Sequence, residues 1–98
     1  MSTPVTIGFD IGGTNMRAGA ITEAGNIIDS TATEAPHDAD ELQEGIVRIV
    51  NMFRADHCIG AVGLAIAGFL DPDCEIVRFA PHLPWRDRHA RAELQAAL

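Results

Sequence analysis

The sequence predicts a single α/β domain in which three antiparallel strands are followed by a helix, a parallel strand, a loop and a second helix. Three observations predict this fold. Short segments with alternating apolar residues occupy the first third of the chain, an amphipathic helical pattern follows, and an uncharged apolar run comes next. The chain has 98 residues, 47% of them hydrophobic and 21% charged, which is enough for one modest core.

The alternating segments predict an antiparallel meander. In the first segment, which begins at Val5, apolar residues alternate with Thr or Gly, as expected for a strand with one buried face. Residues 16–21 form the second predicted strand, and residues 27–28 open the third. The turn over residues 23–26 contains a glycine that can adopt positive φ, so the connection can be tight.

A helix is predicted after Pro36. Asp38 is its expected N-cap, and Glu41 stands three positions later, where it completes a pattern close to a capping box. The apolar residues that follow recur at helical spacing and form one stripe: Leu42, Ile46, Ile49, Val50 and Phe53.

The run CIGAVGLAIAGF, residues 58–69, carries no charge and predicts a strand that is buried on both faces, as in the parallel part of a sheet. Beyond it, residues 71–73 (Asp-Pro-Asp) predict a turn and residues 75–79 a short strand. Two prolines bracket an irregular loop over residues 81–84, and residues 87–98 have the composition of a helix. This helix has no C-cap, which is typical of a fragment.

The composition argues against several classes of function. The formal charge is -7 and all seven basic residues are arginines, so neither nucleic acid nor a membrane is an expected partner. No apolar run reaches the about 20 residues of a membrane-spanning helix, and the first residues lack a signal-peptide pattern, so we expect a cytoplasmic protein. Cys58 and Cys74 are expected to be reduced, partly buried thiols, with a disulfide as the alternative.

The stretch DIGGTN, residues 10–15, places a carboxylate and two glycines at the end of the first strand. A Gly-Gly turn can leave backbone N–H groups uncovered, and such groups form anion sites. Thr14 adds a hydroxyl and Asn15 an amide. Asp10 would repel a phosphate unless a divalent cation lay between them, and Mg²⁺ commonly binds one or two carboxylates plus phosphates. The alternative is a type I′ hairpin in which the glycines serve geometry alone and Asp10 is a solvated turn residue.

Two other phosphate-binding motifs do not fit this stretch. A Walker A loop needs a lysine, and the chain has none. A dinucleotide-binding fingerprint joins a strand to a helix, whereas these glycines join two predicted strands.

The run FDIGGTNMRAGAI, residues 9–21, resembles the first phosphate motif of the actin-like, sugar-kinase and Hsp70 ATPase superfamily, and more narrowly the D-x-G-G-T-x-x-R-x-G pattern of the ROK family. The run GLAIAGFLDPDCEIVRFAPHLPW, residues 63–85, is similar to the ROK stretch that ends a buried strand with Gly, turns through Asp-Pro and reaches a Pro-Asn-Leu segment beside the sugar. The resemblance implies a ribonuclease-H-like (actin-like ATPase) fold and makes residues 1–98 the N-terminal half of a ROK kinase, without its C-terminal domain.

For the site, the resemblance implies that Asp10 organises Mg²⁺, through water. Arg17 either faces the same cleft or makes a structural ion pair. Gly68 would let the sugar approach the backbone, and His82 would contact the sugar, although the family usually has Asn there and a solvent-exposed histidine is the alternative. The phosphates would be held by Gly12, Gly13, Thr14 and Asn15.

The implied activity is that of a hexose kinase, with ATP or polyphosphate as the donor and glucose as the leading acceptor, in a protein that is homo-oligomeric at full length. The catalytic base of the family is expected downstream of Leu98 and any structural zinc site further on, so we expect residues 1–98 to be inactive alone. The alternatives are a ROK-type transcriptional regulator, a kinase for another sugar such as an N-acetylated amino sugar, and a stand-alone binding module. The first strand begins about five residues from Met1, which leaves no space for the DNA-binding segment of a regulator.

Overall fold

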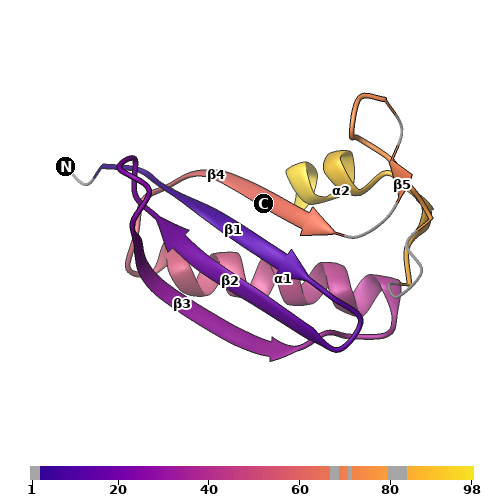
Figure 1. Ribbon diagram of the computed structural model, residues 1–98, viewed down its shortest axis with the longest axis horizontal. Helices are drawn as coiled ribbons and strands as arrows, with labels where there is room; N and C mark the ends of the chain where they lie inside the picture. Colours follow the sequence, from indigo (N-terminus) through magenta and orange to yellow (C-terminus); the bar gives the residue numbers. More distant parts are fainter. Residues whose placement is uncertain (1–2, 67–68, 71, 80–83) are drawn as a thin grey trace.

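The computed structural model describes residues 3–66, 69–70, 72–79 and 84–98. Two sheets and two helices make up this part of the chain (Figure 1). The elements, in order, are β1 (Val5–Ile11), β2 (Asn15–Ile21), β3 (Ile27–Glu34), α1 (Ala39–Arg54), β4 (Ile59–Ile66), β5 (Phe69–Leu70), β6 (Val77–Phe79), β7 (Arg86–Arg88) and α2 (Ala90–Ala97).

The first three strands form the predicted antiparallel meander. β1 pairs with β2 from Thr6 opposite Ile21 to Ile11 opposite Met16, and β2 pairs with β3. The turn between β2 and β3 is tight because Gly25 has a φ of 90°, a conformation that side-chain-bearing residues rarely adopt. The prediction of a positive-φ glycine in this turn is therefore confirmed.

α1 follows the predicted stripe and the predicted cap. The Asp38 carboxylate accepts hydrogen bonds from the backbone N–H of Asp40 at 2.9 Å and of Glu41 at 3.0 Å, which satisfies two of the free donors at the helix start. All five residues of the stripe are buried, and they pack against the inner sides of β1 and β2 in one hydrophobic core. α1 therefore covers one face of the sheet, which leaves the other face open (Figure 1).

β4 runs parallel to β1, as predicted, and gives the sheet the order β3-β2-β1-β4. The prediction that this strand is buried on both faces is wrong for the described residues. Its residues are either half-buried or exposed, because β4 is the outermost of the described strands in this sheet. The side chains of β4 that pack against the core are Ile59, Val62, Leu64 and Ile66.

A second, three-stranded antiparallel sheet has the order β5-β6-β7. The short strand predicted over residues 75–79 is present as β6, whereas β7 occupies a position where the composition predicted the start of a helix. α2 consequently begins at Ala90 instead of residue 87, and it adds Ala90 and Leu94 to the core. Helix propensity placed the start of α2 too early. Residues 86–88 pair with β6 as a strand, and this pairing outweighs their local preference for a helix.

Both cysteines are free, as expected, but Cys58 and Cys74 are exposed instead of partly buried. Cys58 immediately precedes β4, and Cys74 has a φ of 57° in the turn before β6. Neither of the two helices in the described ranges is long and apolar enough to cross a membrane.

Candidate functional site

The loop between β1 and β2 is a short hairpin. The backbone N–H of Gly12 donates to the carbonyl of Asn15 at 2.9 Å, which leaves Gly13 and Thr14 at the tip. Neither tip residue has positive φ. Type I′ and II′ turns require positive φ at one or both central residues, so the type I′ alternative is wrong. The glycine pair is therefore not explained by turn geometry.

Two backbone N–H groups at the tip have no hydrogen-bond acceptor among the described residues. Within the described ranges, no residue accepts a hydrogen bond from the backbone N–H of Gly13 or Thr14. Gly12, Thr14 and Asn15 are exposed and Gly13 is half-buried, so the side chains of the described residues leave most of the turn uncovered. Backbone N–H groups in such a turn, beside a hydroxyl and an amide, suit an anion such as a phosphate.

The described residues around Gly12 leave enough space for a side chain at this position. A Cβ atom built there would meet only the Asn15 carbonyl, at 3.5 Å, which is an ordinary contact. Since neither φ nor crowding requires glycine at this position, the remaining physical reason for it is the close approach of something outside the described residues.

Asp10 and Arg17 lie on the open face of the sheet. They occupy directly opposite positions in the β1–β2 register, and both are exposed. The odd-numbered residues of β1 from Val5 to Ile11 are buried against the helices, so Asp10 points to the other side. Neither side chain makes an ion pair with any residue in the described part of the chain. The structural ion pair considered for Arg17 is thus not formed among these residues.

The donor set suits Mg²⁺ in one specific way. Among the described residues there is no group of three or more His, Cys, Asp or Glu side chains that could enclose a metal ion. Asp10 nevertheless offers an exposed carboxylate beside the tip of the hairpin, and no described residue forms an ion pair with it. Mg²⁺ commonly takes one or two carboxylates and completes its shell with water and substrate phosphates, so Asp10 fits a metal that arrives with a nucleotide.

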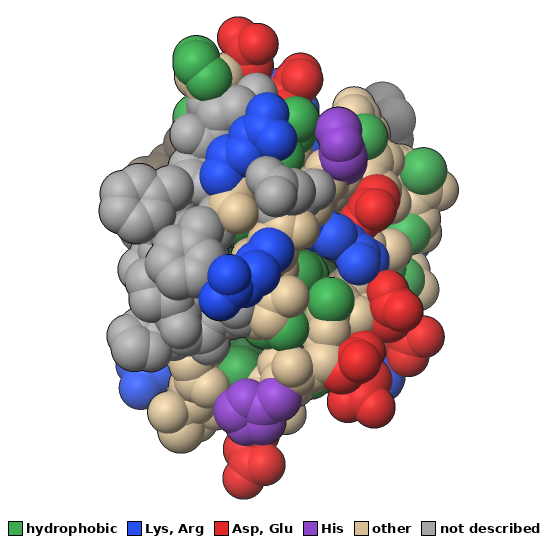
Figure 2. All heavy atoms as spheres, turned by 90° about the vertical axis from the view of Figure 1, so that its right-hand side faces the viewer, with side chains coloured by type: hydrophobic (Ala, Val, Ile, Leu, Met, Phe, Trp, Pro, Cys, Tyr) green, Lys and Arg blue, Asp and Glu red, His purple; other side chains and the backbone are tan. Residues whose placement is uncertain are grey.

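The hairpin, the start of α1 and the second sheet lie at the same end of the molecule, on the right of Figure 1. Figure 2 looks onto this end and shows arginine side chains gathered near its centre, beside acidic side chains. The chain as a whole has a formal charge of -7. Acidic side chains therefore neighbour the arginines at this end, and charge alone does not define an anion site there.

The predicted sugar-side residues, Gly68 and His82, lie outside the described residues. Of the other histidines, His37 and His89 are exposed. The His57 side chain is 18% exposed, and its Nε2 lies 3.2 Å from the Asp29 carboxylate.

A cavity of about 820 Å³ lies between β4, β6 and α2, and none of the predicted site residues that the structure describes lines it. Its wall is largely apolar, with Glu75, Arg91 and Gln95 as polar members. Because the described hairpin residues are absent from this wall, the cavity is separate from the site suggested by the hairpin.

Trp85 and Arg88 contact the first turn of α1, and no sequence pattern singles them out. The acceptors of these contacts lie 45 to 48 residues earlier in the chain, so no local spacing could have revealed them. Arg88 and Glu93, five residues apart, are the one local signal, and a single pair at that spacing is not distinctive.

Residues 6–98 match the sequence profile of the ROK family. The chain is 35% identical over 92 residues to a glucokinase from Streptomyces coelicolor, an alignment that takes in 94% of this chain and 29% of that enzyme. It is 31% identical over 93 residues to an N-acetyl-D-glucosamine kinase from Vibrio parahaemolyticus, with 93% of this chain and 31% of that enzyme aligned. The chain thus spans less than a third of the length of these relatives.

A solved structure agrees with the sequence matches. A ROK family glucokinase from Streptomyces griseus, crystallised in complex with glucose and AMPPNP, superposes with a TM-score of 0.89 at 32% identity. The superposition covers 96% of this chain and 30% of that protein, so the expected ribonuclease-H-like arrangement of strands and helices is confirmed.

Proposed function

This chain belongs to the ROK family, and we propose that it forms the phosphate-binding portion of a sugar kinase that transfers a phosphoryl group from ATP to glucose. In that protein residues 1–98 would be the first of two domains facing a common cleft. The observation that carries the proposal is the β1–β2 hairpin. Among the described residues, its tip N–H groups have no acceptor and the neighbouring Asp10 carboxylate on the open face of the sheet has no ion-pair partner.

Each residue of the hairpin has a role that its position supports. The N–H groups of Gly13 and Thr14, the Thr14 hydroxyl and the Asn15 amide would donate hydrogen bonds to the phosphates. Arg17 would add positive charge, which helps phosphoryl transfer because negative charge is spread over the transferred group.

When bound, Mg²⁺ would neutralise phosphate charge and help to orient the nucleotide. Asp10 is the residue of this chain that would hold it, through water, because its carboxylate is exposed and is not engaged by a described arginine.

Acceptance of the sugar proton is not assigned to any residue of this chain. The family resemblance implies an Asn-Asp pair beyond residue 98 as the source of the base, and a zinc site, if present, in the same later portion. A half-cleft without that base provides neither the closure nor the proton acceptor that transfer needs, so residues 1–98 alone are proposed to be inactive.

Glucose is the proposed acceptor because of the degree of sequence identity. The glucokinases from Streptomyces coelicolor and Streptomyces lividans are each 35% identical to this chain, whereas the N-acetyl-D-glucosamine kinase is 31% identical over a similar length. Gly68 and His82 are the residues proposed to face the sugar. The full-length protein is further proposed to be a cytoplasmic homo-oligomer, and polyphosphate is the alternative donor.

The test is a donor and acceptor screen on the full-length protein. ATP and polyphosphate are each combined with glucose, mannose, N-acetylglucosamine and N-acetylmannosamine in the presence of Mg²⁺, and the phosphorylated sugar is quantified. The expected result is Mg²⁺-dependent formation of glucose 6-phosphate from ATP. Absence of phosphorylation with every pair would overturn the kinase assignment, and preference for an N-acetylated sugar would overturn only the choice of acceptor.

A further inference from the structure

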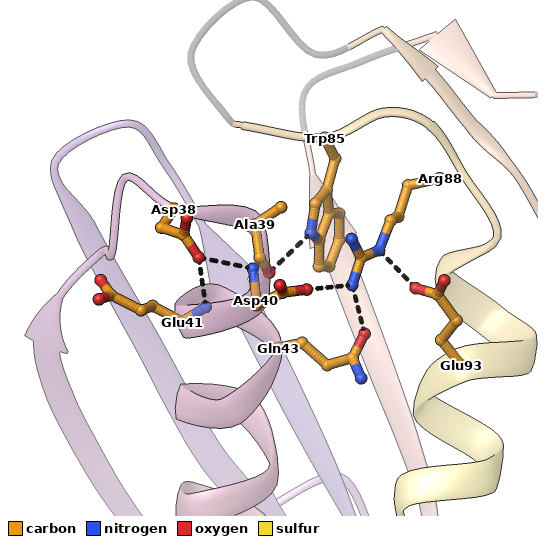
Figure 3. Close-up of polar contacts among 8 residues, drawn as sticks. All are labelled: Asp38, Ala39, Asp40, Glu41, Gln43, Trp85, Arg88 and Glu93. Atoms are coloured by element: carbon orange, nitrogen blue, oxygen red, sulfur yellow. Dashed lines mark hydrogen bonds and ion pairs between the residues drawn. The ribbon is translucent and has the colours of Figure 1, made fainter.

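The first turn of α1 is held by two side chains that come from the C-terminal part of the chain. The Trp85 indole Nε1 donates to the Ala39 carbonyl at 3.5 Å. The Arg88 guanidinium donates through Nη2 to Asp40 Oδ1 at 3.1 Å and to Gln43 Oε1 at 3.0 Å, and through Nε to the Glu93 carboxylate. Figure 3 shows both side chains lying between α1 and α2. We call the contacts of Trp85 and Arg88 with this turn the α1 clasp.

The same turn is also tied to the phosphate-binding hairpin. The backbone N–H of Ala35 donates to the Thr14 carbonyl at 2.9 Å. Asp38, three residues later, caps α1 and fixes the course of the backbone into the helix. Only three residues lie between the hairpin contact at Ala35 and the clasp contact at Ala39, so little of the chain between them is free to adjust.

The α1 clasp has the features of a geometric constraint. Trp85 is 1% exposed, and the Arg88 side chain is 22% exposed with acceptors on two helices. A planar guanidinium that donates in several directions fixes orientation in a way that a single surface ion pair does not. The hydrogen bond to Asp40 raises the pKa of Arg88, with burial opposing, so its charge is retained wherever the protein is folded.

We propose that Arg88 and Trp85 are positioning residues that hold Trp85 and β7 in place relative to the β1–β2 hairpin, through the first turn of α1. This inference rests on the proposed kinase function, in which the FAPHLPW segment that ends at Trp85 serves the sugar and the hairpin serves the donor. Phosphoryl transfer requires the acceptor oxygen and the donor phosphorus to be aligned, and a misplacement of about 1 Å can cost about 100-fold in rate.

The experiment uses the full-length protein and the variants Arg88→Met and Arg88→Lys. Methionine keeps part of the stem volume and removes every donor, whereas lysine keeps the charge but not the planar fork. Steady-state kinetics are measured separately with glucose and with Mg-ATP as the varied substrate. We expect Arg88→Met to lower kcat/KM for glucose by about 10-fold to 100-fold while KM for Mg-ATP stays within about twofold, with Arg88→Lys in between.

Arg91→Met is the matched control. Arg91 lies on α2, is 60% exposed in its side chain, and pairs with Glu75 at 3.7 Å, so it is a surface arginine whose ion pair lies outside the α1 clasp. Its removal is expected to leave both kinetic constants within about twofold of the parent values.

A purely structural role would lower the melting temperature and the active fraction but leave KM for glucose unchanged in the protein that remains folded. That outcome, in Arg88→Met or in Arg88→Lys if methionine prevents folding, would overturn the positioning role. Absence of turnover in the parent protein would instead overturn the proposed function, and the positioning role with it.

Discussion

Asp10 on β1 lies directly opposite Arg17 on β2, yet their side chains do not form an ion pair. Opposite charges at such cross-strand positions stabilise a sheet by roughly 0.2–1 kcal/mol when they pair. Here both groups are exposed on the open face of the sheet and beside the glycine turn. Each therefore stays available to a ligand, one as an acceptor and the other as a donor.

Replacement of Asp10 tests the metal role of the carboxylate. Asp10→Ala in the full-length protein is expected to lower Mg-ATP-dependent kcat by about 100-fold or more, because an electrostatic contact to the reacting group is lost. Its folding should be unchanged because the side chain is exposed and makes no ion pair with a described residue. Asp56→Ala, at an exposed position after α1, is the control and should retain full activity. Full activity in Asp10→Ala would rule out the metal role.

Gly12 and Gly25 are expected to respond oppositely to alanine. Gly12→Ala should fold with a stability within about 1 kcal/mol of the parent, since its φ is not positive and its Cβ has space. It should nevertheless raise KM for Mg-ATP by about 10-fold, because a methyl group would stand where the nucleotide approaches.

Gly25→Ala should leave KM unchanged and destabilise the fold by about 1 kcal/mol, because its φ is 90°. Thermal melts and Mg-ATP kinetics on the two variants separate these effects. If Gly12→Ala bound Mg-ATP normally, the close approach of a phosphate to this loop would be excluded.

The N-cap of α1 is expected to contribute measurably to stability. Asp38→Ala removes the acceptor of two backbone hydrogen bonds and should cost about 1 kcal/mol, whereas Asp38→Ser should recover most of that loss. Urea denaturation of both variants is the measurement. Equal stability of the alanine and serine variants would contradict a capping role.

The contribution of Arg88 to stability should not vary over the neutral and mildly alkaline range. Its pKa is raised in the folded protein, so its stabilisation is fully present below the unfolded pKa and is lost only as the pH rises through the folded value. The difference in unfolding free energy between the parent and Arg88→Met should therefore be constant from about pH 7 to about pH 10. Urea denaturation at several pH values measures it, and a difference that shrank within this range would contradict the assignment.

Residues 1–98 expressed alone should fail to phosphorylate glucose. The full-length protein is expected to turn over at the ordinary kinase rate of about 1–100 per second, whereas the isolated portion lacks a proposed base and cannot close a cleft. Glucose 6-phosphate formation by equal molar amounts of the two proteins is the comparison. Comparable rates would place the whole catalytic apparatus within this chain.

Sequence patterns predicted those parts of the fold that depend on interactions between residues close in sequence, namely helix periodicity, helix capping and tight turns. Leu42 and Phe53 recur at helical spacing and are buried, Asp38 caps the helix, and Gly25 provides the tight turn. The hairpin residues were found in the same way, because a carboxylate followed by two glycines at a strand end is an unusual local pattern.

The features that could not be predicted depend on contacts between residues far apart in the sequence. Residues 86–88 form β7 only because β6 lies beside them, and Arg88 finds its partners on α1 more than 40 residues earlier. The exposure of β4 was missed for a related reason. An apolar run indicates a strand that suits burial on both faces, but it does not say which neighbours are present.

The outermost position of β4 has a practical consequence for work with this polypeptide. Among the described strands, none pairs with the side of β4 that faces away from β1, so backbone donors and acceptors along Ile59–Ile66 can take up an extended chain. Residues 1–98 produced in isolation should self-associate at high concentration for this reason. The same strand edge makes residues 1–98 suitable for split-protein reconstitution, in which a separately expressed remainder of the full-length protein would dock along β4 and restore the proposed kinase activity.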